Sequence, residues 1–334
     1  MATAPTQEHA DVSQVGTHAY PLMLSRVTEA AAIASARLVG HGEKNEADRL
    51  ATEAMREELG RLPLSGTVVI GEGERDEAPM LYKGEELGAG GQEVDIAVDP
   101  LEGTNLCANG WPESITMMAT AEKGGLFGAP DCYMDLIVAG KEAKGQVSLG
   151  QTTEENVKAL AKAYNRNVTD LTISILDRDR SEQMIGEIRQ AGARVKLITD
   201  GTLIQAIAAM IRGDGVHALM GTSAAPEGVI KAACAKCLGG HMEGRFKGYS
   251  EQTQKMVEEA GLDDTRIYSA EELAPGEDIH FAATGVTDGT VLKGVRAFGG
   301  GMRTHTIILS THMQGMRFLD TTHVTNKDEV TFQL

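Results

Sequence analysis

Cysteine and aromatic residues are scarce in this chain of 334 residues. It contains four cysteines, and aromatic residues make up 4% of the sequence. Four cysteines are too few for a disulfide framework. Cys234 and Cys237 lie in a helical pattern without the second cysteine pair of a zinc site, so we expect structural thiols. With so few aromatic rings, the core must consist mainly of Ala, Val, Leu, Ile and Met.

The chain also lacks an excess of positive charge and any long apolar run. It has 31 Lys and Arg against 48 Asp and Glu, for a net charge of −17. This charge argues against a nucleic-acid or anionic-membrane partner. No stretch approaches the length of a membrane span, and residues 1–16 lack the apolar centre of a secretory signal. We therefore expect a cytoplasmic protein, or a plastid protein if a transit peptide has been removed.

The length suggests one large domain or two of medium size. We expect a flexible tail at residues 1–19, a first αβ domain at 20–168 and a second at 169–334. Strands and helices alternate between residues 171 and 238, which predicts a parallel sheet covered by helices. The predicted helices are 20–39, 46–59, 153–164, 181–191, 203–212, 226–238, 251–261 and 270–273. The predicted strands are 67–70, 94–99, 113–121, 133–140, 171–176, 194–198, 216–220, 279–283, 291–298, 304–310 and 316–319.

The stretch from Val94 to Thr104 carries the most chemical information. Its first half alternates apolar and polar residues, as a strand does, and we expect Pro100 to end that strand. Gly103 allows a tight turn, so several oxygen atoms should gather at the strand end. These belong to the side chains of Asp99, Glu102 and Thr104 and the carbonyl of Leu101. Such oxygens suit Mg²⁺, although a turn with solvated acids is the alternative reading.

A second strand upstream ends in acids of the same kind. The apolar run 67–70 is followed by Gly71-Glu72-Gly73-Glu74 and then by Asp76. Strand ends at one edge of an open α/β sheet are the usual place for a ligand. The two acidic segments can therefore lie together at one sheet edge.

Together these motifs resemble the class II fructose-1,6-bisphosphatases, which are lithium-sensitive, Mg²⁺-dependent sugar phosphatases. The dual fructose-1,6-/sedoheptulose-1,7-bisphosphatases of cyanobacteria look most similar. Further matching motifs run in order from about residue 20 to about residue 325. They include Lys44–Asp48, Ala129–Asp131, Ala225–Gly228 and Ala283–Gly285. The resemblance implies an α/β sugar-phosphatase fold, layered αβαβα, with two mixed sheets and helices.

The resemblance also implies a catalytic site that holds Mg²⁺ or Mn²⁺. The implied metal ligands are Asp48, Glu72, Asp99, the Leu101 carbonyl, Glu102 and Glu227. Thr104 and Asp48 would orient and deprotonate the attacking water, and Asp76 would hold a further metal or position water. The alternative is that Thr104 only stabilises its turn and Asp48 only caps its helix. The expected reaction is hydrolysis of the 1-phosphate of a ketose bisphosphate in carbohydrate metabolism.

Substrate contacts follow from the same resemblance. They are Lys44, Gly103, Thr104, Tyr133, Arg178, Arg180, Asp200, Gly201 and Thr202. Arg178 and Arg180, two residues apart after a strand, can point to one side and hold the phosphate away from the metals. For a single Lys, Arg or Tyr, the alternative is a solvated tip. The expected partners are a sugar bisphosphate and further copies of the chain, often a tetramer in this family.

The chain departs from the family pattern near the expected sugar contacts. Asp179, Ser181, Thr202 and Ser223 stand where the family usually has Pro, His, Asp and Gly, and Trp111 replaces a Gln. Asp179 should weaken anion binding, and Thr202 removes an acceptor for a sugar hydroxyl. Two alternatives therefore remain open. One is a phosphatase of another sugar or inositol phosphate, and the other is a non-catalytic relative that senses a metal or metabolite.

Overall fold

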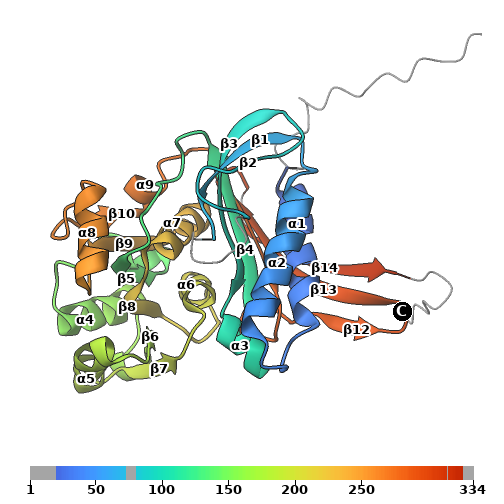
Figure 1. Cartoon of the computed structure of the whole chain (residues 1–334). Coiled ribbons are helices and arrows are strands. Elements are labelled where there is room, and N and C mark those ends of the chain that lie inside the picture. Colours follow the sequence, from blue (N-terminus) through green and yellow to red (C-terminus); the bar gives the residue numbers. More distant parts are fainter. Residues whose placement is uncertain (1–19, 73–79, 314, 326–334) are drawn as a thin grey trace, which may run out of the picture.

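Two β-sheets form the framework, with helices on their outer faces and between them (Figure 1). The computed structural model describes residues 20–72, 80–313 and 315–325. From one side to the other, the layers are two helices, an eight-stranded sheet, two helices, a six-stranded sheet and a last layer of helices. This confirms the expected αβαβα arrangement with two mixed sheets.

The eight-stranded sheet has the order β12-β13-β11-β4-β3-β1-β2, with β14 also paired to β13. Only β1 and β3 are parallel, and the other pairs are antiparallel. Its strands are β1 (Leu64–Ile70), β2 (Glu86–Leu87), β3 (Gln92–Glu102), β4 (Ile115–Glu122), β11 (His280–Gly285), β12 (Arg296–Phe298), β13 (Gly301–Ser310) and β14 (Arg317–Val324).

The six-stranded sheet has the order β10-β9-β5-β8-β6-β7. Strands β7, β6 and β8 are parallel, as the alternating pattern predicts, whereas β5, β9 and β10 pair antiparallel. Its strands are β5 (Tyr133–Ala139), β6 (Thr172–Leu176), β7 (Arg194–Ile198), β8 (Ala218–Ala224), β9 (His241–Lys247) and β10 (Tyr268–Ser269). The sequence pattern did not predict β9, the strand beside β5.

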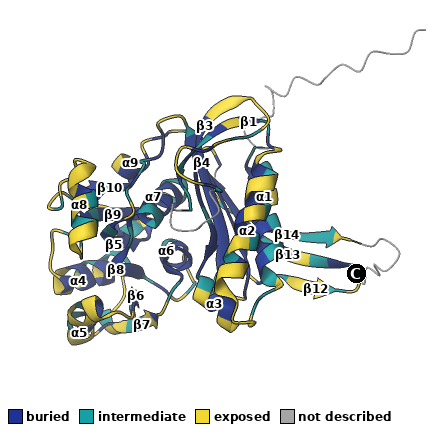
Figure 2. Ribbon diagram, viewed as in Figure 1, coloured by how far each residue is buried: buried dark blue, intermediate teal, exposed yellow. Residues whose placement is uncertain are grey.

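The helices differ in how much of their surface is buried. α6 and α7 lie between the sheets and are buried along most of their length, while α1, α2, α4, α5 and α8 keep an exposed face (Figure 2). The bounds are α1 (Tyr20–Ala36), α2 (Lys44–Leu59), α3 (Thr104–Asn109), α4 (Thr153–Ala163), α5 (Glu182–Gln190), α6 (Thr202–Met210), α7 (Ala225–Leu238), α8 (Glu251–Glu259) and α9 (Ala270–Leu273).

The core is aliphatic, as the composition requires. Its largest cluster fills the space between the sheets with Ala, Ile, Leu, Val and Met, and adds Phe246 and Phe281. The four cysteine thiols are free, and Cys107, Cys132 and Cys234 are buried. Among the described helices, none combines the length and apolar character that a membrane crossing needs.

The chain passes between the sheets twice. β5 precedes residue 168 but lies in the six-stranded sheet, and β11 to β14 follow residue 168 but lie in the eight-stranded sheet. Sheet membership therefore changes near residues 130 and 275. The boundary at residue 168 stays a prediction about domains and does not coincide with a division between the sheets. The expected tail at 1–19 lies outside the described residues.

Pro100 does not end its strand, contrary to our expectation. β3 continues to Glu102, and its register with β4 shifts between Asp99 and Glu102. A proline is tolerated in a sheet at such an irregularity, because the missing N–H is not needed there. Leu101 donates its backbone N–H to Asp99 Oδ1 at 3.1 Å within the same irregular segment. The strand therefore carries the acids further than the sequence pattern predicts.

Candidate active site

The parallel pair β1 and β3 brings two acidic segments to one edge of the eight-stranded sheet. Ile70 at the end of β1 is the register partner of Ala97 in β3. Both strands run in the same direction, so Glu72 emerges beside the segment that holds Asp99 and Glu102. The sequence predicted this juxtaposition from two strand ends.

Asp48 approaches this edge from α2. Burial raises the pKa of Asp99 well above its ordinary value, and the negative charges of Glu72, Glu102, Glu227 and Asp48 raise it further. Carboxylates perturb one another in this way only when they share a small region. The structure therefore places the other four predicted acidic side chains around Asp99.

The second half of the chain contributes two helix starts to the same region. Thr202, the first residue of α6, donates its hydroxyl to Glu227 Oε2 at 2.7 Å, and its oxygen lies 3.3 Å from Glu102 Oε1. The backbone N–H of Leu203 donates to Glu102 Oε1 at 2.7 Å. Glu102 on β3 is thus tied directly to α6, and Thr202 joins it to Glu227 in the first turn of α7. Residues from both halves of the chain therefore meet at Glu102.

Thr202 is placed differently from our expectation of a sugar contact. It is buried among carboxylates, and its hydroxyl is engaged with Glu227. A short uncharged side chain fits between two acids where a third carboxylate would add repulsion. The departure at this position therefore changes the charge at the acids themselves.

Glu102 is the most enclosed of these acids, with 3% of its surface exposed. Burial raises its pKa, as do Glu227 and Asp200, against the opposing effects of Lys231 and the Leu203 N–H. Within the described residues, its buried Oε2 atom has no hydrogen-bond partner. An oxygen of this kind is costly unless a cation or donor satisfies it.

These acids form a suitable donor set for a hard divalent cation. Mg²⁺ and Mn²⁺ are bound mainly by carboxylate and carbonyl oxygens. A bound ion would provide a partner for the Glu102 Oε2 atom and would lower the raised pKa of Asp99. As they are placed, no three His, Cys, Asp or Glu side chains of the described residues converge closely enough to form a ready-made metal site. The acids are therefore electrostatically coupled without being drawn together as a ligand cage.

Lys231 is a member of this group that the sequence analysis missed. Its side chain is 0% exposed, and its Nζ lies 2.9 Å from Glu227 Oε2 and 3.2 Å from Ser223 Oγ. The signal was present in the sequence, because Glu227 and Lys231 are four residues apart in a predicted helix and such pairs face each other. Ser223, one of the departures from the family pattern, is a partner of this lysine.

Two left-handed glycines start the helices beside the acids. Gly103 precedes α3 with φ 77°, and Gly201 precedes α6 with φ 77°. Only glycine takes this conformation without strain. Asp200, next to Gly201, lies 3.5 Å from the Asn105 amide of α3. Asp200 is thus brought next to α3, the helix that begins at Thr104. The substrate contacts of Thr104 and Asp200 stay a prediction.

The two arginines have different partners, contrary to the expectation that they point to one side. Arg178 donates to the backbone carbonyls of Asp177 and Thr199, at 2.9 and 2.7 Å. Arg180 lies with its guanidinium carbon 4.9 Å from the Tyr133 ring centre and 5.7 Å from that of Tyr249. The cause is local, because residues 179–181 form a 3₁₀ helix and positions i and i+2 no longer share a face.

Arg180 borders a cavity of about 640 Å³ on the six-stranded sheet. Asp135, which also lines the cavity, accepts hydrogen bonds from the Tyr249 hydroxyl at 2.8 Å and the Thr222 hydroxyl at 2.7 Å. It also forms an ion pair with Arg245 at 3.3 Å. The cavity is lined by the basic residues Arg180 and Arg245, the acidic residues Asp135, Glu154 and Glu187, and the Tyr249 ring. Tyr249 was not among the predicted residues.

Lys44 and Asp76 are the last two of the predicted site residues. Lys44 is exposed at the start of α2, one turn before Asp48 and on the same helix face. Asp76 lies outside the described residues.

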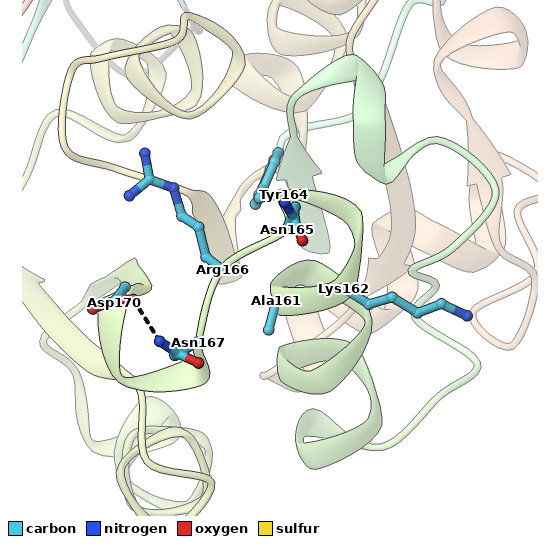
Figure 3. A pocket seen from close by; sticks show the side chains of 7 residues that line it. All are labelled: Ala161, Lys162, Tyr164, Asn165, Arg166, Asn167 and Asp170. Atoms are coloured by element: carbon cyan, nitrogen blue, oxygen red, sulfur yellow. Dashed lines mark hydrogen bonds between the residues drawn. The ribbon is translucent and has the colours of Figure 1, made fainter.

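A separate hollow of about 610 Å³ lies at the C-terminal end of α4 (Figure 3). It is lined by Ala161, Lys162, Tyr164, Asn165, Arg166, Asn167 and Asp170. On one side of it, the Asn167 amide donates to Asp170 at 3.3 Å (Figure 3). None of the predicted site residues lines this hollow.

Comparisons with known proteins identify the family of the chain. The model of the family described as "Bacterial fructose-1,6-bisphosphatase, glpX-encoded" matches residues 18–323. The chain is 47% identical over 329 residues to the D-fructose 1,6-bisphosphatase class 2/sedoheptulose 1,7-bisphosphatase of Synechococcus sp. (strain JA-3-3Ab), covering 91% of this chain and 95% of that protein. It is 48% identical to the protein of the same description from Synechococcus elongatus, with the same coverage.

One solved structure is also similar, at a much lower level. It is the extragenic suppressor protein suhB from Bartonella henselae, with 17% identity, a TM-score of 0.32, and coverage of 57% of this chain and 72% of that one. This likeness is too weak to carry an argument about the site.

Proposed function

Because the chain belongs to the family of glpX-encoded bacterial fructose-1,6-bisphosphatases, we propose that it hydrolyses the 1-phosphate of fructose-1,6-bisphosphate and of sedoheptulose-1,7-bisphosphate. The observation that carries this proposal is the gathering of carboxylates from β3, α2, α7 and the end of β1 around Asp99. The printed names of the cyanobacterial relatives support the pair of substrates.

The reaction depends on Mg²⁺ or Mn²⁺. The residues that would hold the metal are Asp48, Glu72, Asp99, the Leu101 carbonyl and Glu102, and Glu227 faces the same group from α7. When bound, a divalent metal neutralises the phosphate dianion and lowers the pKa of water. This also explains how an anionic substrate approaches a protein with net charge −17.

Thr104 and Asp48 serve the attacking water. The Thr104 hydroxyl sits at the start of α3, held by the left-handed Gly103, and Asp48 faces the same acids from α2. A hydroxyl can accept a hydrogen bond from the water while it donates to a carboxylate, which moves a proton away from the attacking oxygen. Asp76 remains a candidate for positioning water.

The distal phosphate is held by Arg180. Its guanidinium lies against the Tyr133 ring, and Arg180 lines the cavity on the six-stranded sheet. The Arg178 donors are used on backbone carbonyls, so Arg178 shapes the loop that carries Asp200 and Gly201. Lys44, Asp200, Gly201 and the Gly103 amide complete the proposed contacts with substrate.

A phosphate-release assay tests this function directly. The purified chain is incubated with fructose-1,6-bisphosphate, sedoheptulose-1,7-bisphosphate, fructose 1-phosphate and inositol 1-phosphate, each with Mg²⁺, with Mn²⁺ and with chelator. We expect both bisphosphates to be hydrolysed at the 1-position only when a metal is present. Preference for a monophosphate would instead support the alternative substrate class, and a metal-binding chain with no turnover would support the non-catalytic reading.

The assembly and location are further parts of the proposal. We expect a homotetramer in the cytoplasm, as the resemblance implies. Light scattering coupled to gel filtration measures the mass against the 35.5 kDa of one chain. A monomer at micromolar concentration would contradict the tetramer.

A further inference from the structure

The acidic side chains around Asp99 lie on two sides of the site, a β3 side and an α7 side. The two sides differ in how close positive charge lies to them. On the β3 side, the buried Oε2 atom of Glu102 has no hydrogen-bond partner within the described residues. On the α7 side, the Oε2 atom of Glu227 lies 2.9 Å from the Lys231 Nζ and accepts a hydrogen bond from the Thr202 hydroxyl at 2.7 Å. Glu227 and Glu102 share the Thr202 hydroxyl as a neighbour, so the contrast arises over a short distance.

Lys231 is the source of this contrast, and its burial is complete. It is among the largest of the fully buried side chains that the structure describes. A buried ammonium group needs an opposite charge and hydrogen-bond acceptors, because desolvation of an isolated charge is expensive. Glu227 at 2.9 Å and Ser223 at 3.2 Å provide them. Glu227 Oε2 therefore has two donors, Lys231 and Thr202, both from the protein.

Resting on the proposed function, we propose that Lys231 is a built-in cation of the metal site, which neutralises Glu227 and excludes a divalent ion from the α7 side. Glu227 is then a partner of Lys231 rather than a metal ligand. The metals are held on the other side, by Asp48, Glu72, Asp99 and Glu102.

The physical reason is electrostatic exclusion. An ammonium group within hydrogen-bond distance of Glu227 Oε2 repels a divalent cation that approaches the same oxygen. The Thr202 hydroxyl occupies a further acceptor direction on that oxygen. Thr202 and Ser223, two departures from the family pattern, both contact this ion pair, so they act together with Lys231.

Removal of the built-in charge should admit another metal. We would strip the full-length chain with chelator and count bound Mn²⁺ by equilibrium titration, with free Mn²⁺ read from its electron paramagnetic resonance signal. Lys231→Met removes the charge and keeps most of the side-chain volume. We expect it to bind one more Mn²⁺ per chain than the wild type. An unchanged number of ions overturns the proposal, whatever happens to their affinity.

A second variant keeps the test decisive if Lys231→Met does not fold. Glu227→Gln should bind as many Mn²⁺ ions as the wild type, because Glu227 is not a ligand. Loss of one ion in this variant overturns the proposal. The double variant Lys231→Met/Glu227→Gln removes both charges together, so it avoids leaving either one buried alone. It should also match the wild type in the number of bound ions, and a lower number would contradict us.

Lys236→Met is the matched control. Lys236 is on the same helix, and its Nζ donates to the carbonyls of Ala274 and Gly276 at 2.8 and 2.6 Å, away from the acids. We expect Lys236→Met to bind as many Mn²⁺ ions per chain as the wild type. If it bound one more, an additional ion in Lys231→Met could not be attributed to the charge of Lys231. A wild type that binds no Mn²⁺ and releases no phosphate would refute the proposed function. An active, Mn²⁺-binding wild type with an unchanged count in Lys231→Met would refute this inference alone.

Discussion

Carboxylates on the two sides of the site show opposite pKa shifts. Burial and four neighbouring acids raise the pKa of Asp99 at the end of β3, whereas Lys231 and Thr202 hold that of Glu227 in α7 below its ordinary value. The same chemical group therefore behaves differently according to whether the protein provides a cation for it. Asp99 and Glu102 keep a raised pKa although Lys231 partly offsets the shift of Glu102, whereas Glu227 has Lys231 as its direct partner.

The largest loss of activity should follow from a substitution on the β3 side of the site. We expect Asp99→Asn to lower kcat at least about a hundredfold, as for removal of one strong electrostatic partner of the transition state. The amide keeps the shape and most of the hydrogen bonding, so the circular dichroism spectrum should not change. The measurement is phosphate release at saturating Mg²⁺.

Asp95→Asn is the control on the same strand. Asp95 is buried, but its Oδ2 accepts from the backbone N–H groups of Gly124 and Leu126 at 2.8 and 3.2 Å. This carboxylate is satisfied by the protein and lies outside the site, so its loss should cost stability and leave kcat nearly unchanged. Equal losses of turnover in the two variants would break the comparison between satisfied and dependent acids.

Thr104 should show the next largest effect. Thr104→Val removes the hydroxyl and keeps the shape, and we expect kcat to fall about a hundredfold while KM changes little, because a group that moves a proton acts in the transition state. Thr104→Ser should retain most of the activity. If Thr104→Val weakened substrate binding at normal kcat, the residue would be a substrate contact or a turn residue instead.

The two arginines provide a comparison of intermediate size. Arg180→Ala should lower kcat/KM for fructose-1,6-bisphosphate by about thirtyfold, which corresponds to about 2 kcal/mol. It should have much less effect on fructose 1-phosphate, which lacks the distal phosphate. Arg178→Ala should lower kcat/KM for both substrates by the same factor, because the Arg178 guanidinium donates hydrogen bonds to backbone carbonyls. Equal losses on both substrates in Arg180→Ala would show that Arg180 also acts through structure.

The sequence predicted the arrangement of the acids on the β3 side of the site better than that of the residues from α6 and α7. The acids of the β3 side follow predicted strand ends, so their meeting could be inferred from the direction of two parallel strands. The positions of Thr202 and Lys231 depend on how α6 and α7 pack between the sheets, which local patterns do not determine. The partners of Arg178 and Arg180 depend on a 3₁₀ turn that spacing alone does not reveal.

The fold shows the same division between local and long-range information. Most helices and strands were predicted to within a few residues, because apolar periodicity is a local property. Sheet membership was less accessible, since β5 pairs with β8 and β9, which lie about 80 residues or more further along the chain. The continuation of β3 through Pro100 was missed because the register shift between β3 and β4 is not visible in the sequence.

The smallest effect concerns Glu122, an acid that is satisfied by the backbone and lies outside the site. Burial would raise its pKa, but the backbone N–H groups of Glu277 and Asp278, at 2.7 and 3.0 Å, bring the pKa below its ordinary value. A lowered carboxyl pKa contributes stability above the unfolded pKa, and this contribution is lost as the pH falls through the folded pKa. We expect Glu122→Gln to lower the free energy of unfolding by about 1 kcal/mol at pH 7.

The pH dependence separates this effect from a loss of packing. Urea unfolding of wild type and Glu122→Gln between pH 7 and pH 3 should show the stability difference shrinking below about pH 4, near the ordinary carboxyl pKa. The Mn²⁺ count and kcat should stay at wild-type values, because the backbone already supplies donors to this carboxylate. A stability difference that is constant with pH would mean that Glu122 stabilises the chain through packing. A reduced Mn²⁺ count would instead extend the metal-dependent group of acids along β4.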